Sequence, residues 1–215
     1  MYILTVNCGS SSLKLDVIDT QTQQCVTELK AERLPEERDI TLNGKTLTYT
    51  GELLFPSILT FCLEAVKKDL ADKTISGIGH RVVHGGDKYY QPVLIDEQVT
   101  KTIEDLIDLA PLHNPANLSG IKAAQQVFPN FPNTAVFDSG FHQTLPSRAK
   151  QYAIDKEIAK KYNIKRYGFH GTSHRYVAQK AADWLKQDMK NLKTKSILLS
   201  LSRKDNVLLS KVLIS

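Results

Sequence analysis

Residues 2–18, YILTVNCGSSSLKLDVI, contain two runs of alternating apolar and polar residues separated by a turn rich in glycine and serine. Such alternation, together with β-branched residues, is typical of half-buried strands. The turn joins two strands, whereas a P-loop leads from a strand into a helix. The stretch therefore predicts a strand–turn–strand unit whose turn is rich in hydrogen-bond donors.

The remaining elements follow in an order typical of α/β proteins. Asn43-Gly44 is a strong signal for a hairpin turn. We expect Asn114 to cap one helix and Thr172-Ser173 to cap another. Apolar periodicity predicts strands at residues 25–29, 39–42, 45–49, 75–83, 133–137 and 197–201, and helices at 56–70, 96–109, 114–127, 155–162 and 172–185. The pattern predicts an α/β fold.

Composition limits the classes of function. The 215 residues carry a net charge of +5, and residues 190–215 hold six basic residues and one acid. The preceding residues are electrically neutral, so the charge belongs to a basic tail, and we expect no nucleic-acid partner. No signal peptide and no apolar run long enough to span a bilayer is evident, so we expect no membrane association.

Cysteine usage bears on the cellular compartment. Cys8, Cys25 and Cys62 are widely spaced, odd in number and lack a Cys-x-x-Cys pair. This pattern disfavours a disulfide framework or a zinc-thiolate site. We therefore expect a cytoplasmic protein.

Clusters of polar residues occur at several places along the chain. In the first turn, the hydroxyls of Ser10 and Ser12 and the charge of Lys14, which we expect to point inward, suit phosphate oxygens. An ordinary hairpin with polar turn residues is the alternative. Arg81 lies among residues expected to be buried, so it requires an anionic partner, either a ligand or an internal salt bridge. His80 and His84 are four residues apart, but their position at a strand end disfavours zinc.

Three further polar residues lie at the ends of predicted elements. His113 precedes a helix start, where anions are favoured, and Asp138 follows an apolar strand. His170 lies in Arg166–His174, which holds two imidazoles, two glycines, two aliphatic hydroxyls and an arginine. Each residue could be merely structural. Together, however, the clusters match phosphoryl transfer between a nucleotide and a small anionic acceptor.

These motifs support a family resemblance. The segments 7–14, 79–86, 111–115, 137–142 and 166–174 resemble those of the acetate kinases in order and spacing. The acetate kinases belong to the superfamily of acetate and sugar kinases, Hsp70 and actin. The resemblance covers roughly residues 1–190. Cys8 and Ser139-Gly140 depart from the commoner Ala and Thr-Ala at those places.

The resemblance implies a fold and an activity. The fold would be the N-terminal domain of the actin-like, ribonuclease-H-like ATPases plus the beginning of a second, incomplete domain. We expect an acceptor and phosphate domain at 1–150, the start of a nucleotide-side domain at 151–195, and an atypical basic tail at 196–215. The reaction would be ATP plus acetate giving ADP plus acetyl phosphate, reversibly, with Mg²⁺ or Mn²⁺. Family members are usually homodimers.

The resemblance also implies a role for each matching position. Arg81 would bind the acceptor carboxylate, and His113 and His170 would donate to the transferring phosphoryl group. Asp138 is the family's essential acid, which would hold the metal together with Asn7. Val83, Leu112 and Phe169 would line an apolar pocket, and nucleotide phosphates would contact Lys14, Ser10 and Ser12.

The family's second half carries motifs that these residues lack. They are a His-x-Gly-Asn-Gly turn, an arginine in a Thr-Arg-Ser-Gly-Asp context and a late metal-associated Glu. We therefore expect a chain truncated or frameshifted after about residue 195 and inactive alone. The alternatives are a non-catalytic remnant or small-anion-binding module, and a propionate or butyrate kinase.

Overall fold

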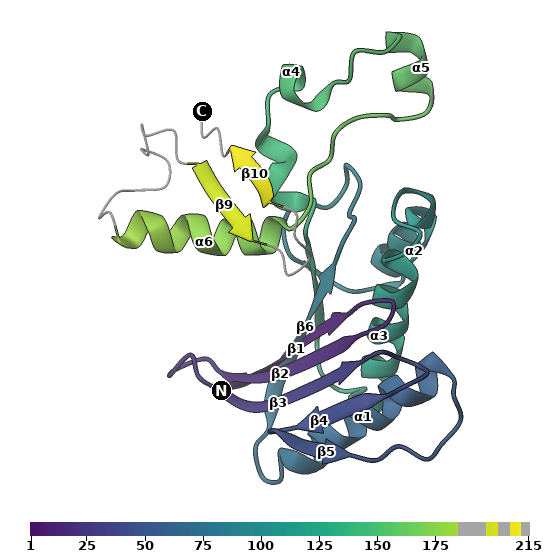
Figure 1. Ribbon diagram of the computed structural model, residues 1–215, viewed down its shortest axis with the longest axis vertical. Coiled ribbons are helices and arrows are strands. Elements are labelled where there is room, and N and C mark those ends of the chain that lie inside the picture. The colour runs from purple at the N-terminus through teal and green to yellow at the C-terminus, as the bar shows by residue number, and fades with distance from the viewer. Residues whose placement is uncertain (185–196, 202–206, 212–215) are drawn as a thin grey trace. The chain divides into compact units, whose positions relative to one another are not determined.

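The computed structural model describes residues 1–184, 197–201 and 207–211 (Figure 1). The chain forms two compact units, Met1–Phe137 and Asp138–Ser215. Among the described residues, no helix has the length and apolar character needed to cross a membrane. A mixed sheet with helices packed on it confirms the α/β class predicted from the sequence.

The first unit is built on an eight-stranded sheet in the order β5-β4-β3-β2-β1-β6-β8-β7. Strands β1 to β5 are antiparallel neighbours, β6 pairs parallel with both β1 and β8, and β7 is an antiparallel edge strand. The strands span Tyr2–Cys8 (β1), Leu13–Asp19 (β2), Cys25–Glu32 (β3), Asp39–Leu42 (β4), Lys45–Leu47 (β5), Ile75–Val82 (β6), Val93–Leu94 (β7) and Asn133–Phe137 (β8). Every strand predicted within this unit is present.

The hairpin predicted at Asn43-Gly44 joins β4 to β5. Both turn residues have positive φ, 50° for Asn43 and 78° for Gly44. A two-residue type I′ turn requires this conformation, which asparagine and glycine adopt most readily.

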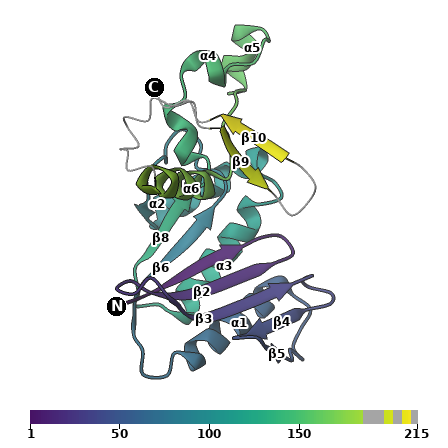
Figure 2. The same cartoon turned by 60° about the vertical axis from the view of Figure 1, so that its left-hand side comes forward.

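Helices α1 (Phe55–Asp69) and α3 (Asn114–Val127) pack together on one face of the sheet, as Figures 1 and 2 show. Apolar residues at helical spacing on α1 are buried against the alternating apolar residues of the strands. This core includes Leu4, Val6, Leu15, Val17, Ile58, Leu59 and Cys62. The other face of β1, β2 and β3 carries the polar side chains of Thr5, Lys14, Asp16, Glu28 and Lys30, together with Ile3 and Ile18.

The helix predicted at 96–109 is two shorter elements. Helix α2 (Glu97–Asp105) begins after Asp96, whose carboxylate accepts a hydrogen bond of 2.7 Å from the amide of Val99. A 3₁₀ turn, η1 (Ile107–Leu109), follows. Helix α2 packs against α3.

The second unit begins with η2 (Gly140–Thr144) and α4 (Ser147–Lys150). Helix α5 (Lys156–Lys161) has Asp155 as its cap, and α6 (Gly171–Trp184) follows. Strands β9 (Ile197–Leu201) and β10 (Val207–Lys211) pair antiparallel, which confirms the strand expected at 197–201. The helix end expected at residue 185 lies outside the described residues.

Two predicted helix caps are wrong. Helix α3 begins at Asn114, with His113 in the cap position, and α6 begins at Gly171, so Thr172 lies inside its first turn. The Asn114 amide and the Thr172 hydroxyl instead bond to segments distant in sequence. These tertiary partners override the local capping preference.

Candidate active site

The polar turn predicted between β1 and β2 is present. The Gly9 amide donates to the Ser12 carbonyl oxygen at 2.8 Å, which closes the turn. Ser10 and Ser12 are both exposed. Their hydroxyls therefore lie at the surface where a ligand could reach them.

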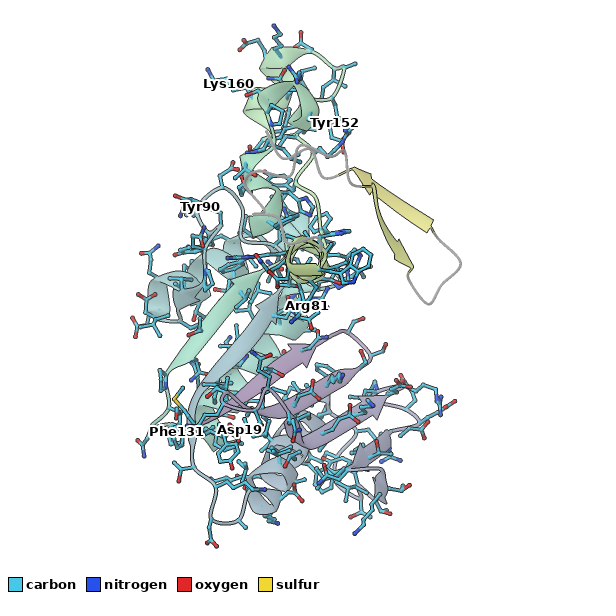
Figure 3. All side chains as sticks on the ribbon, turned by 90° about the vertical axis from the view of Figure 1, so that its left-hand side faces the viewer. Asp19, Arg81, Tyr90, Phe131, Tyr152 and Lys160 are labelled. Carbon is cyan, nitrogen blue, oxygen red and sulfur yellow. The ribbon has the colours of Figure 1, made fainter. Side chains whose placement is uncertain are left out.

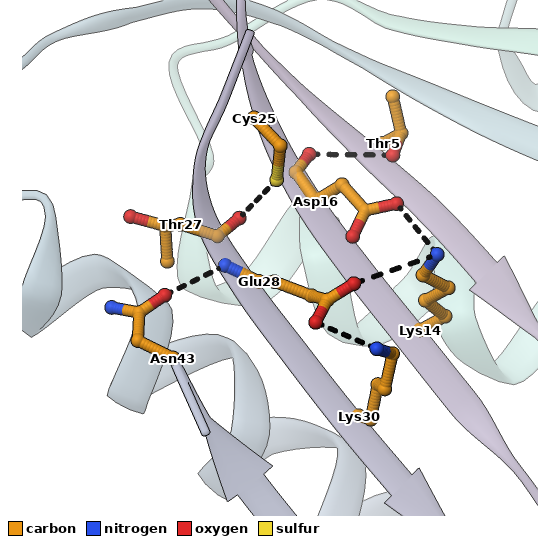
Figure 4. A network of polar contacts seen from close by, with 8 residues as sticks. All are labelled: Thr5, Lys14, Asp16, Cys25, Thr27, Glu28, Lys30 and Asn43. Carbon is orange, nitrogen blue, oxygen red and sulfur yellow. Dashed lines mark hydrogen bonds and ion pairs between the residues drawn. The ribbon is translucent and has the colours of Figure 1, made fainter. Parts of the chain in front are cut away.

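Lys14 follows this turn, and its predicted inward orientation is wrong. Its neighbours Leu13 and Leu15 fill the core, so strand alternation places Lys14 on the opposite, exposed face. The Lys14 ammonium forms ion pairs with Asp16 at 3.5 Å and Glu28 at 3.7 Å (Figure 4). Phosphate binding by Lys14 would therefore compete with two carboxylates.

Arg81 lies near the end of β6, next to β1. Its Nη1 donates a hydrogen bond of 3.0 Å to Oδ1 of Asn7. The β-branched residues Val82 and Val83 are buried as predicted, whereas Arg81 is itself partly exposed. Figure 3 shows Arg81 at the opposite end of the sheet from Asp19 and Phe131. Open α/β sheets bind ligands at the carboxyl ends of their parallel strands, which is where Arg81 lies.

Two buried asparagines of α3 hold the strand ends that carry Asn7 and Arg81. The Asn117 amide donates to the Cys8 carbonyl oxygen at 2.7 Å and accepts from the Val83 amide at 3.0 Å. Asn114 accepts from the His84 amide at 3.3 Å. Sequence reasoning missed both roles. The available signal was a pair of amides, three residues apart, on the apolar face of a predicted helix.

His80 and His84 are both buried. Nε2 of His80 lies 2.7 Å from Oδ1 of Asn133, while its Nδ1 is buried and has no hydrogen-bond partner among the residues that the structure describes. Burial lowers the pKa of His80 to about 4. Nδ1 of His84 accepts a hydrogen bond from the Gly86 amide at 2.9 Å. Within the described ranges, no cluster of three or more His, Cys, Asp or Glu side chains could hold a metal ion.

The three cysteines are free thiols. Cys8 and Cys62 are buried, and burial raises the pKa of each thiol to about 12. A thiol with so high a pKa is a poor nucleophile at neutral pH.

The remaining predicted residues of the first unit differ in exposure. Val83 is buried, with 6% of its surface exposed, whereas Leu112 is 70% exposed. His113 is exposed, and its side chain makes no capping hydrogen bond to α3.

In the second unit, two hydrogen bonds join Asp138 to the start of α6. The Gly171 amide donates to the Asp138 carbonyl oxygen at 3.0 Å, and the Thr172 hydroxyl donates to Asp138 Oδ1 at 2.6 Å. Asp138 is fully buried. A Cβ atom on Gly171 would lie 2.0 Å from the Asp138 carbonyl oxygen, so only glycine permits this approach.

His170 lies in the loop between Gly168 and α6. Its backbone φ is +56°, and Gly168 has φ of +77°. The His170 and Phe169 side chains are exposed, Phe169 to 41%. The carbonyl oxygen of Phe169 accepts a hydrogen bond of 2.9 Å from Nε2 of His142.

Comparison with known proteins identifies the family. The model of the Acetokinase family matches residues 2–201. The acetate kinase of Clostridium botulinum is 43% identical over 210 residues, which cover 90% of this chain and 51% of that protein.

Solved structures give the same result. The propionate kinase of Francisella tularensis has a TM-score of 0.83 and 38% identity, over 93% of this chain and 52% of that one. The acetate kinase of Porphyromonas gingivalis has a TM-score of 0.80 and 34% identity, over 92% and 51%. This similarity confirms the predicted actin-like ATPase fold. The chain spans about half the length of the curated relatives it matches, and it belongs to the acetokinase family.

Proposed function

We propose that this protein transfers a phosphoryl group reversibly between ATP and acetate, giving ADP and acetyl phosphate. Membership of a kinase family supports the reaction class. The observation that carries the proposal is Arg81, bonded to Asn7 at the carboxyl ends of β1 and β6. A partly exposed guanidinium in that place matches a carboxylate in charge and shape.

The acceptor needs binding more than chemical activation. A carboxylic acid with a pKa of about 4–5 is already ionised at neutral pH, so no general base has to remove its proton. Arg81 binds the carboxylate, and the apolar residues assigned to the acceptor's alkyl group are Val83, Leu112 and Phe169. Because the relative from Francisella tularensis is named a propionate kinase, propionate is the second candidate acceptor. Butyrate is a further alternative, and pocket size would distinguish the three acids.

Charge on the transferring phosphoryl group is stabilised by donors. His113 and His170, both exposed, donate to its oxygens, with His170 as the main stabiliser of the transition state. Ser10, Ser12 and Lys14 contact nucleotide phosphates. Lys14 must then exchange Asp16 and Glu28 for phosphate oxygens.

Asp138 and Asn7 fit a role with Mg²⁺ or Mn²⁺. A carboxylate and an amide oxygen are hard ligands, and Mg²⁺ usually takes one or two carboxylates together with substrate phosphates and water. The Thr172 hydroxyl fixes Oδ1 of Asp138, which orients the carboxylate. The ion, when bound, neutralises charge on the phosphates.

For the 215-residue chain alone, we propose acceptor binding without turnover, because it spans about half the length of its curated relatives. For this polypeptide, that proposal corresponds to the alternative to catalysis, a non-catalytic anion-binding module. The domain limits at 150 and 195, a homodimeric assembly and a cytoplasmic location also stay predictions.

The test combines binding with turnover. We expect acetate to shift NMR signals of the strand ends in the wild-type chain and in Arg148→Gln, an exposed arginine of α4, but not in Arg81→Gln. Equal NMR shifts on adding acetate in all three proteins would contradict the assignment of Arg81 as the residue that binds the carboxylate. We also expect no acetyl hydroxamate from ATP, acetate and hydroxylamine. Hydroxamate above the Arg81→Gln background would show that the chain turns over alone.

A further inference from the structure

His142 has no role in the proposed reaction, although it lies in a conspicuous polar motif. It belongs to η2, and its imidazole is about half-buried, with edge-on ring contacts to Phe141 and His174. Its Nε2 lies 2.9 Å from the carbonyl oxygen of Phe169. A carbonyl oxygen can only accept, so Nε2 carries the proton and donates it.

This bond acts on the peptide that joins Phe169 to His170. The carbonyl oxygen of Phe169 and the amide nitrogen of His170 share one rigid peptide plane. His170 has a left-handed backbone, with φ of +56°, which residues other than glycine adopt reluctantly. A hydrogen bond that fixes this peptide plane therefore helps to hold His170 in a conformation that it would otherwise leave.

The same imidazole supports the loop from a second direction. Gly168 lies so close to His142 that an added Cβ would be 2.5 Å from the ring carbon Cγ. On the far side of His170, the Gly171 amide bonds to the Asp138 carbonyl oxygen. The loop is thus anchored to His142 before His170 and to Asp138 after it.

We propose that His142 is a positioning residue, which holds the Gly168–His170 loop so that the exposed His170 imidazole is presented to the phosphoryl group. The proposal rests on the proposed function for the role of His170. The geometry of the loop itself is independent of that role. His142 acts through the Phe169 peptide and contacts no substrate.

The test uses two amide variants that differ only in reach. In His142→Gln, the side-chain amide nitrogen occupies the place of Nε2, whereas in His142→Asn it reaches only to the place of Nδ1. The reporters are hydrogen exchange at the amides of Gly171 and His174, which bond to Asp138 and His170. The amides of β1 and β6 serve as an internal control for global stability.

We expect the wild type and His142→Gln to protect both reporters, and His142→Asn to lose about tenfold protection. That factor corresponds to one hydrogen bond of ordinary net strength. Equal protection in His142→Asn, or an equal loss in His142→Gln, would overturn the proposal. Should His142→Asn fail to fold, His142→Phe keeps the ring and removes the donor, with the same expected loss.

A separate titration distinguishes this proposal from the proposed function. Inorganic phosphate is added to the wild-type chain while the His170 imidazole signals are followed. If the His170 signals do not respond to phosphate, the proposed contact with the phosphoryl group is contradicted. The positioning role still stands if amide protection depends on the hydrogen-bond donor at position 142. A response that is lost in His142→Asn and restored in His142→Gln supports both.

Discussion

The hydroxyl of Thr172 donates a hydrogen bond of 2.6 Å to Oδ1 of Asp138, a fully buried carboxylate 34 residues earlier. Together with the Gly171 amide, which bonds to the carbonyl oxygen of Asp138, it fastens the first turn of α6 to Asp138 within the second unit. Buried carboxylates depend strongly on such donors. Thr172 therefore serves as a hydrogen-bond donor to a buried carboxylate, a role that its position in a helix does not suggest.

Thr172→Val tests this bond with almost no change of side-chain shape. We expect a loss of about 1–3 kcal/mol in the free energy of unfolding, because Asp138 loses a buried donor. Thr172→Ser retains the hydroxyl and should stay much closer to the wild type. Urea denaturation followed by circular dichroism measures both, and equal midpoints for the two variants would contradict the assignment.

Gly171→Ala should destabilise the chain by about 1–3 kcal/mol, because its Cβ would lie 2.0 Å from backbone that cannot easily move. Gly79→Ala is the matched control, since nothing lies within 4 Å of a Cβ at that position. Thermal unfolding of the two variants and the wild type measures the loss of stability caused by each substitution. A similar small effect from both would mean that Gly171 is not required at this contact.

Asn117→Ala removes both bonds that tie the end of β1 to the residue after β6. We expect a cost of roughly 2–4 kcal/mol, because the Val83 amide and the Cys8 carbonyl oxygen each lose a buried partner. The NMR response of Arg81 to acetate should weaken as well. Lys122→Ala, at an exposed position on the same helix, should change the free energy of unfolding by less than about 0.5 kcal/mol.

Acid should destabilise the fold through His80. Its pKa is about 4 in the folded chain, against the 6.5 that is ordinary for a histidine side chain, so the unfolded chain binds the proton more tightly. The stabilisation is complete above pH 6.5 and is lost progressively as the pH falls to about 4. By pH 5 the loss from this group should be about 2 kcal/mol.

His80→Gln isolates that contribution, because its side-chain nitrogen can still donate to Asn133 and does not titrate. The wild type should lose about 2 kcal/mol more than the variant between pH 7 and pH 5, as measured by urea denaturation at each pH. Parallel losses in the two proteins would show that another group controls the acid transition.

Local sequence signals predicted the longer strands and helices, but not the short elements β7, η2 and α4. Alternation predicted β1 and β2, Asn43-Gly44 predicted the hairpin of β4 and β5, and apolar spacing predicted α1, since each signal depends on residues close together in the chain. The same local logic set Arg81 near a strand end and Asp138 directly after β8. Five polar clusters then identified the family.

The pairing of polar groups that are distant in sequence depends on tertiary contacts. Asn117 bonds to Cys8, 109 residues away, and Thr172 bonds to Asp138, 34 residues away. Lys14 turns from the core because the leucines beside it occupy that face. These polar groups need partners because the fold buries them, and a buried polar group without a hydrogen bond is costly. A local sequence pattern does not show which distant group will supply that bond.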